Sequence, residues 1–526
     1  MYESGLKKFA RSFVLMIFAL IIIVLTYLCT FFNAYTSVDE KTTIVSDNPF
    51  KLILYFIAVL VALFFIRRYY QVQKSMPYKK MFLVVSLITL IAAIYVVFFH
   101  NIFPVADQQE ILNAASGLKN GDYSYFLPTG YVGKCTNQAG IVMILYYLSF
   151  IFGDNNYQVF QLLNVFALLL SYYSICEISE ISFSNDELKK WTLILLMLFV
   201  PLTWYIVFVY GNLFGLGFSL YAVLCGYRYF EDRKIKDIVL SFVGITLSMM
   251  FKSNYSITFV AMVFFVIFDI ILNKNFKTII LLILLIPAYF ASSMIPAYMI
   301  EKKTGIELGK GIPMTAYIEM GLQDSPDAPG WFNGYNWNVY TNNGSDSEKA
   351  SEQVKTDLQN TITYYIENPD VFKSFIYRKT VSQWCNPDFQ GTWLTRHSDF
   401  YFHNDIYYAL VNILQAIILL GTLAYIYFTG RHMPLHRLLL PMIFIGGFIF
   451  HLFWEAKGQY TITYFVLLIP YCAKGLMDMS DDVAEGILTL KRNSSILEII
   501  RHFSKRNTIQ YIIGLIIICT IISLLI

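Results

Sequence analysis

The chain has 526 residues, of which 57% are hydrophobic, 17% aromatic and 14% charged, and its mean hydropathy is +0.54. Soluble domains carry roughly 25% charged residues, so this composition excludes an ordinary soluble protein and is typical of a polytopic membrane protein. A net charge of +3 is too small to indicate a nucleic-acid partner.

The first predicted element is a retained membrane helix. Residues 5–11 carry basic side chains and lead into an apolar stretch that has no small-residue cleavage site. Further apolar segments of about 16–23 residues follow, long enough or nearly so to cross a hydrocarbon core. No strand-like alternation is present, so we predict an all-α polytopic protein with about thirteen transmembrane helices. They lie near residues 12–33, 50–67, 81–99, 157–177, 190–208, 211–228, 236–251, 254–272, 277–298, 406–428, 436–454, 459–477 and 509–526.

Lysine and arginine cluster between alternate spans and set the predicted orientation. Arg67 and Arg68, and likewise Lys189 and Lys190, fall in short loops on one side. Cytoplasmic loops are enriched in basic residues, so we predict a multi-pass protein of the cell membrane with a cytoplasmic N-terminus. If the apolar stretch 138–152 crossed the membrane, every later loop would lie on the opposite side from the one that its basic residues indicate. It is therefore predicted to lie in the outer interface.

Four regions follow from this topology. We predict two N-terminal transmembrane helices in 1–80, a transmembrane core in 81–298 with an outer loop at 100–156, an extracytoplasmic loop domain in 299–405, and C-terminal transmembrane helices in 406–526. Loops as long as the third region usually carry function. Within it, residues 347–367 place apolar side chains at helical spacing, which predicts an amphipathic helix.

Seven cysteines are present, and none belongs to a CxxC pair. Five fall in predicted spans or at their edges, where cysteine is most simply a small core residue. Cys135 and Cys385 fall in the two long outer loops, so a disulfide between them is one open possibility.

A single aspartate near the start of the first outer loop is the candidate catalytic residue. Asp107 is followed by Gln108 and Glu110. A carboxylate at the mouth of a helical membrane protein stands where a reaction at the lipid–water boundary needs a base. The alternative is a solvated loop acid without a role.

Other charged side chains are predicted where further spans emerge. Lys252 lies at the tip between two spans, and Glu455, Lys457, Gln459 and Tyr460 belong to the turn between two more. Charges at such positions are costly unless they are solvated or paired, which predicts a polar cavity. The alternative is that these lysines only extend towards the interface from helix ends.

Four short stretches give the chain a resemblance to a known family. They are Pro313–Leu322, Pro329–Tyr335, Lys379–Asp388 and Trp454–Tyr460. With the order of span, Asp-bearing outer loop, interfacial helix ending in Phe-Gly and further span, they resemble the GT-C superfamily of membrane glycosyltransferases. Protein O-mannosyltransferases and aminoarabinose–lipid A transferases belong to it. The chain is most similar to bacterial family 39-like members, and the resemblance covers most of residues 80–477.

The chain departs from that family pattern in three ways. Many members have Asp-Glu at the loop acid, whereas Gln108 follows Asp107 here. Many carry a second acid in a short outer turn that here reads Tyr210-Gly211-Asn212, so a two-carboxylate metal site is not expected. Two extra helices also precede the module.

The resemblance implies a polyprenyl-phosphate sugar donor and a glycan, teichoic acid or lipid acceptor, with surrounding membrane lipids and no metal, cofactor or nucleic acid. Asp107 would be the general base that takes the proton of the acceptor hydroxyl, in a metal-independent, inverting displacement. Nearby cations would stabilise the leaving phosphate. The residues expected on this basis to bind the donor are Lys252, Arg378, Lys379, Glu455, Lys457, Gln459 and Tyr460. Possible contacts to the acceptor or sugar are Gln108, Glu110, Trp331, Trp384 and Asp388.

Two other functions remain open. A transporter or flippase of lipid-linked oligosaccharide would show Gly- or Pro-broken spans in matched halves with ionisable groups near mid-membrane, and the sequence shows few of these signs. An O-antigen-type polymerase or ligase would also have a large outer loop, but would use a lipid-pyrophosphate donor.

Overall fold

The computed structural model describes residues 5–70, 76–274, 276–398, 404–428, 433–434, 437–490 and 495–525. Residues 436 and 526, which belong to two of the predicted spans, lie outside these ranges. The helices are α1 (Gly5–Phe31), α2 (Pro49–Phe65), α4 (Tyr78–Phe99), α5 (Asp107–Asn120), α6 (Tyr131–Lys134), α7 (Ala139–Phe152), α8 (Tyr157–Phe183), α9 (Asp186–Leu198), α10 (Val200–Trp204), α11 (Asn212–Asp232), α12 (Ile235–Phe251), α13 (Ser256–Asn273), α14 (Ile279–Thr304), α15 (Met314–Gly321), α16 (Tyr335–Asn342), α17 (Ser347–Glu367), α18 (Pro369–Trp384), α19 (Asp405–Phe428), α20 (Leu439–Phe453), α21 (Ile462–Thr489), α22 (Ile496–Phe503) and α23 (Asn507–Leu525). The strands are β1 (Phe32–Thr36) and β2 (Thr42–Ser46).

The chain is a predominantly helical multi-pass membrane protein. Among the described residues, ten helices are long and apolar enough to cross a membrane, or up to twelve if each of two bent pairs is one span. The ten coincide with ten of the predicted spans. The predicted total of about thirteen is therefore not confirmed.

The three remaining predicted spans are short or broken. The predicted span 190–208 is divided into α9 and α10 with a bend of 62°, and Pro201 lies in the first turn of α10. Proline lacks a backbone N–H, so it starts a new helix more readily than it continues one. Helix α12 has 17 residues and α20 has 15. Both are shorter than the roughly 20 residues that cross a bilayer without bilayer thinning.

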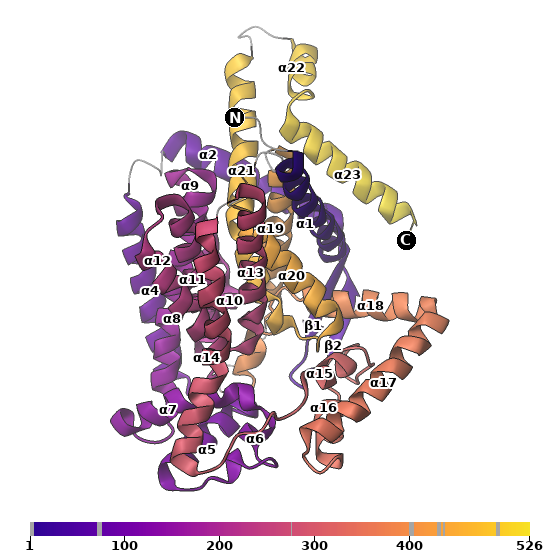
Figure 1. The fold of residues 1–526 in the computed structure, drawn as a ribbon. Coiled ribbons are helices and arrows are strands. Elements are labelled where there is room, and N and C mark those ends of the chain that lie inside the picture. Colours follow the sequence, from indigo (N-terminus) through magenta and orange to yellow (C-terminus); the bar gives the residue numbers. More distant parts are fainter. Residues whose placement is uncertain are drawn as a thin grey trace.

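Long connections gather at one end of the bundle, which we call the loop end (residues 100–156 and 305–398). Figure 1 shows α5, α6 and α7 at this end below the long helices, with α15, α16 and α17 beside them. Helix α7 lies across the bundle, is bent by 100° relative to residues 124–134, and packs against α5 and α14. An apolar helix in this position fits the predicted interfacial placement, which stays a prediction.

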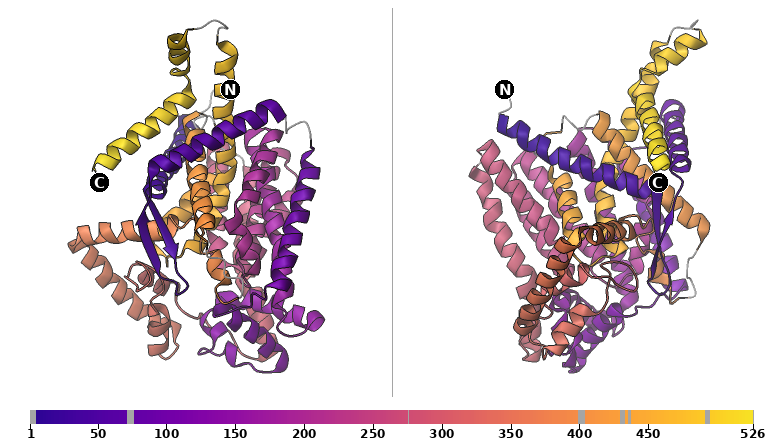
Figure 2. Two further views of the ribbon diagram at one scale, coloured as in Figure 1. Left: turned by 180° about the vertical axis from the view of Figure 1, so that it is seen from behind. Right: turned by 90° about the vertical axis from the view of Figure 1, so that its right-hand side faces the viewer.

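A β-hairpin joins α1 to α2 and corrects the expectation that no strand is present. Strands β1 and β2 pair antiparallel from Phe32 opposite Ser46 to Thr36 opposite Thr42. The hairpin descends towards the loop end, as both views in Figure 2 show. The backbone N–H of Ala34 donates to the Cys385 carbonyl at 2.8 Å. Since Cys385 directly follows α18, the hairpin is bonded to the second long loop.

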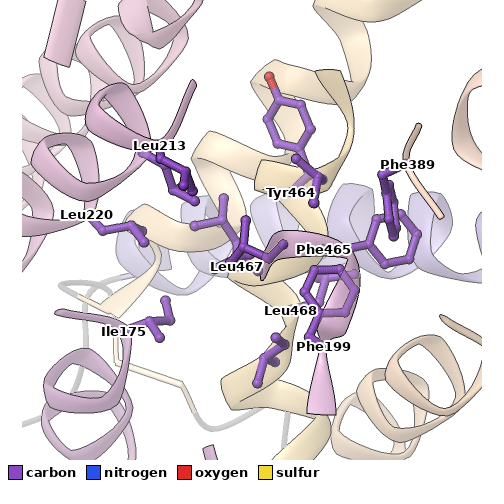
Figure 3. Packing of buried hydrophobic residues seen from close by; sticks show 14 of the residues in the cluster. Ile175, Phe199, Leu213, Leu220, Phe389, Tyr464, Phe465, Leu467 and Leu468 are labelled. Atoms are coloured by element: carbon purple, nitrogen blue, oxygen red, sulfur yellow. The ribbon is translucent and has the colours of Figure 1, made fainter. Parts of the chain in front are cut away.

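The core includes one loop segment packed among the helices. Phe389 lies against Phe465 of α21, with ring centroids 4.9 Å apart, and against Phe199 at 5.5 Å (Figure 3). Phe389 and Gln390 both have positive φ, at 51° and 58°. This conformation is rare for such residues and persists only where the surroundings enforce it. The segment after α18 is thus firmly fixed.

The possible Cys135–Cys385 disulfide is not formed. Every cysteine is a free thiol. The Cys385 sulfur lies 3.4 Å from that of Cys29 in α1, because the hairpin brings the end of α1 to the second loop.

The amphipathic helix predicted at 347–367 is confirmed as α17. Its first half buries Ala350 and Val354. Its second half exposes Ile362 and Ile366.

Candidate active site

Asp107 is the first residue of α5 at the loop end. Ala106 before it has φ 51° and ψ −128°, a strained conformation for alanine. Asp107 is exposed, and no described residue forms a hydrogen bond or ion pair with its carboxylate. A helix N-terminus stabilises negative charge. The carboxylate is therefore held in a fixed place with oxygens free to accept a proton.

Lys252 directly follows α12 and lies against two tyrosine rings. Its Nζ is 4.1 Å from the ring centroid of Tyr210 and 5.9 Å from that of Tyr460. Ring faces attract a cation without neutralising it. Burial lowers the pKa of Lys252 to about 8, although the charges of Asp107 and Glu455 oppose this shift. No described side chain forms an ion pair with the ammonium, so it can receive an anion.

The turn between α20 and α21 carries an acid and a base. Glu455 is buried, and the Tyr460 hydroxyl donates to its Oε2 at 3.1 Å. Burial raises the pKa of Glu455. Lys457 Nζ donates to Oε1 of Glu40 at 2.9 Å. Burial lowers the pKa of Lys457, but Glu40 and Glu455 outweigh it and raise the pKa above its ordinary value.

These four residues form one charged cluster (Asp107, Lys252, Glu455 and Lys457). The charge of Asp107 acts on each of the other three, which come from two different interhelical turns. Charges act strongly on one another only over short distances. Asp107, Lys252, Glu455 and Lys457 therefore lie near enough for charge interaction, while the shared cleft expected from the sequence and the roles of the residues stay predictions.

A pocket enclosing about 430 Å³, part of it open to solvent, is lined by one member of this cluster, Lys252. Lys252, Gln459 and Tyr460 line it beside Asn212 and His451. Two buried polar atoms of this lining, Asn212 Oδ1 and His451 Nδ1, have no hydrogen-bond partner in the described structure. Buried polar groups are nearly always paired, so each of these two atoms can form a hydrogen bond with a water molecule or with a polar group of a ligand.

A second pocket of about 410 Å³ lies in line with the first, and its lining is almost wholly apolar. Thr258 of α13 lines the first pocket, and Met262 and Val266 line the second. These residues are four apart and share one helix face. On α20, Ile443 of the first pocket lies one turn from Leu439 of the second. Two separate pockets, one with polar lining residues and one almost wholly apolar, thus follow one another along α13 and α20.

Lys379 of α18 is buried away from the pocket. Its Nζ donates to the carbonyls of Gly321 at 2.5 Å and Trp454 at 2.8 Å. Burial lowers its pKa to about 7. A Cβ on Gly330 would lie 2.8 Å from Lys379 Cε, so glycine is needed there to admit the lysine. In this structure Lys379 joins backbone segments, and it does not face the pocket as a donor-binding residue would.

Three other residues predicted to contact substrate have structural partners or lie apart. Arg378 is 44% exposed and reaches Asp324 at 3.4 Å on the loop surface. Gln108 is buried, and its Oε1 accepts from the backbone N–H of Val209 at 2.8 Å. Gln108 therefore fixes Asp107 to the segment that carries Tyr210. Glu110 is half-buried; its backbone N–H donates to the Ala106 carbonyl at 3.1 Å, and its carboxylate takes part in no described hydrogen bond.

The predicted sugar and acceptor contacts at Trp331, Trp384 and Asp388 are corrected by their burial. Both tryptophans are fully enclosed, so neither offers a ring face to a sugar. The Asp388 carboxylate accepts from the Tyr407 hydroxyl at 2.6 Å and from the Thr392 backbone and hydroxyl. Burial raises its pKa to about 6, against these hydrogen bonds. These side chains hold the loop together.

Sequence reasoning missed Glu40, Tyr210 and His451. Tyr210 lay in the turn noted only for its missing acid, and its hydroxyl accepts from Gln138 Nε2 at 2.7 Å. His451 lies one turn before Glu455 in α20, which is a signal that could have been followed. Glu40 had no signal, because its partner Lys457 is 417 residues away.

In the described part of the chain, no group of three or more His, Cys, Asp or Glu side chains could hold a metal ion. No protein-family model, curated protein or solved structure matches this sequence or fold.

Proposed function

We propose that the protein is a membrane glycosyltransferase that moves a sugar from a polyprenyl-phosphate donor to an extracytoplasmic acceptor. The observation that carries this proposal is the pairing of Lys252, an ammonium without a carboxylate partner that lines a pocket, with Asp107, a carboxylate free of hydrogen bonds whose charge acts on Lys252. Such a transfer requires a base that takes the proton of the acceptor and a cation that binds the phosphate.

Asp107 is the general base in this proposal. The acceptor hydroxyl attacks the anomeric carbon of the sugar and its proton passes to the carboxylate of Asp107. The bond from that carbon to the phosphate oxygen breaks, and the phosphate leaves with the electron pair. Attack opposite to the leaving group inverts the anomeric configuration.

Lys252 is the cation that receives the phosphate. A charge-assisted hydrogen bond to phosphate is strong, and it strengthens as the leaving group gains charge. The orphaned Nδ1 of His451 can donate to a ligand oxygen when it carries the proton, and Asn212 Oδ1 can accept from a sugar hydroxyl. Lys457 and Lys379, although expected to bind the phosphate, already donate to protein oxygens.

The apolar pocket further along α13 and α20 supports a lipid-linked donor. A phosphate bound at Lys252 would leave its chain beside Thr258, with Met262 and Val266 of the apolar pocket further along the same helix face. A water-soluble nucleotide sugar would have no use for an apolar pocket there. The predicted orientation places the loop end outside the cell membrane, where a wall polysaccharide, teichoic acid or lipid-linked glycan is available as acceptor.

The test is transfer of radiolabelled sugar from a polyprenyl phosphate in membranes that contain the protein or its Asp107→Asn variant. We expect the variant to lose about 10³-fold in rate while its thermal stability is unchanged, because the amide cannot take the proton. Glu307→Gln is the matched control, since Glu307 is an exposed acid of the same end without a described partner.

Activity of Asp107→Asn within about tenfold of wild type would remove Asp107 as the base. If the wild type binds the donor but transfers no sugar, the proposed reaction is wrong. That result would favour a transporter or a polymerase.

A further inference from the structure

The turn of the N-terminal hairpin reaches the charged cluster. Glu40 lies between β1 and β2 with φ 66°, a conformation that residues other than glycine adopt rarely. Its Oε1 accepts from Lys457 Nζ at 2.9 Å and from Gln390 Nε2 at 3.3 Å. The two side chains of the ion pair are only 16% and 22% exposed, so solvent screens this pair less than a surface pair.

The hairpin is held rigidly enough to fix this carboxylate. The Asn386 side chain donates to Thr36 Oγ1 at 2.8 Å, and the Trp393 indole donates to the Val38 carbonyl at 3.1 Å. The backbone N–H of Thr42 donates to the carbonyl of residue 327 at 3.1 Å. Three bonds to two separate parts of the second loop leave the turn little freedom.

Lys457 has several other charges within reach. Glu455 precedes it in the same turn, and Asp107 and Asp327 lie near enough for charge interaction with it. Without Glu40, the flexible lysine side chain could approach Asp107 and occupy the oxygens that the proposed reaction needs. Its ammonium could also compete with Lys252 for the phosphate.

We propose that Glu40 is a positioning residue, which holds the Lys457 ammonium at the hairpin so that Asp107 stays free as the base and Lys252 stays the cation that receives the phosphate. This inference rests on the proposed function, and it makes the N-terminal hairpin part of the active site. Glu40 does not touch the reacting atoms.

The first measurement needs no transfer assay. Only a neutral amine reacts with an acylating reagent, so the ion pair with the partly buried Glu40 protects Lys457. A pair with Asp107, which is exposed to solvent, would protect the ammonium less. In competitive labelling of the purified full-length protein, read by mass spectrometry, we expect Lys457 to react at least about fivefold faster in Glu40→Gln than in wild type. The exposed Lys355 is the internal reference. Asp39→Asn removes an exposed acid from the same turn and should change nothing. Equal labelling in wild type and Glu40→Gln would overturn the inference.

The second measurement is transfer itself. We expect Glu40→Gln to lower kcat about tenfold with the donor KM within about threefold, because the base is obstructed while the phosphate site persists. A Glu40→Gln rate within twofold of Asp39→Asn would overturn the inference.

The double variant Glu40→Gln with Lys457→Gln separates positioning from simple tethering. It has no ion pair to tether the hairpin and no ammonium at position 457 that could reach Asp107, so we expect kcat to recover to within about threefold of wild type. A kcat as low as that of Glu40→Gln alone would mean that the pair only tethers the hairpin, which overturns the inference. A wild type without any transfer would refute the proposed reaction, while the labelling result would still decide the Glu40 contact.

Discussion

Lys252 and Lys379 show how differently two buried lysines can be used at one end of the same bundle. Burial lowers the pKa of both, to about 8 and about 7. Lys379 donates to two backbone carbonyls. Its side chain packs so closely against Gly330 that a Cβ there would lie 2.8 Å from Lys379 Cε. Lys252 lies on aromatic faces at the mouth of a pocket and donates to no described group. The comparison teaches that a lowered pKa alone does not separate a structural lysine from a candidate binding residue, and that the proposal for Lys252 rests on its unused hydrogen-bonding capacity beside a cavity.

The largest effect that separates the two lysines is expected at Lys252. Its replacement in Lys252→Met should lower kcat/KM for the donor about 100-fold, because the leaving phosphate loses its cation. The melting temperature should hold, since no protein acceptor loses its donor. Lys310→Met, at an exposed lysine of the loop end, is the control. A decrease below about fivefold would mean that another group receives the phosphate.

The opposite result is expected for Lys379→Met. This change leaves the carbonyls of Gly321 and Trp454 without a donor, and each costs about 1–3 kcal/mol when buried and unpaired. Relief of the buried charge offsets part of that, so we expect a loss of about 2 kcal/mol, seen as a lower melting temperature and lower yield. Protein that remains folded should transfer sugar normally. Lys373→Met, at an exposed position of the same helix, should melt as wild type does.

The smallest expected effect is a change in the pH dependence of transfer, which tests the role of Lys252. A lysine with a pKa of about 8 is charged below that pH and loses its proton as the pH rises through it. Donor kcat/KM in the wild type should therefore fall about tenfold per unit above pH 8. Lys252→Arg keeps its charge, so its decline should begin at higher pH even if its rate is lower. An identical alkaline limb in both proteins would show that a different group titrates.

Much of the fold was predictable, because length and hydrophobicity alone determine whether a segment can span a bilayer. Helices α12 and α20, of 17 and 15 residues, lie close to the predicted spans 236–251 and 436–454 and end just before the turns that carry Lys252 and Glu455. Pro201 in the sequence could have predicted the break between α9 and α10. The hairpin was missed because each of its strands has only five residues.

The candidate site was predictable only in part. Asp107, Lys252 and Glu455 could be expected to meet, since each follows or precedes a span at the same end of the bundle. The burial of Trp384 and Asp388 could not be expected, because irregular loop segments show no periodicity from which an inner face can be inferred. Sequence patterns also carry no information about which polar atoms remain unpaired, such as Nδ1 of His451.

The ion pair between Glu40 and Lys457 also bears on how the protein is made. Its two halves are separated by 417 residues, so they are synthesised roughly 20–80 s apart at ribosomal speeds of about 5–20 residues per second. Glu40 therefore lacks this partner until almost the whole polypeptide has been synthesised. The proposed site would then be completed only in the last stage of biogenesis, and a nascent chain that stalls midway would lack it.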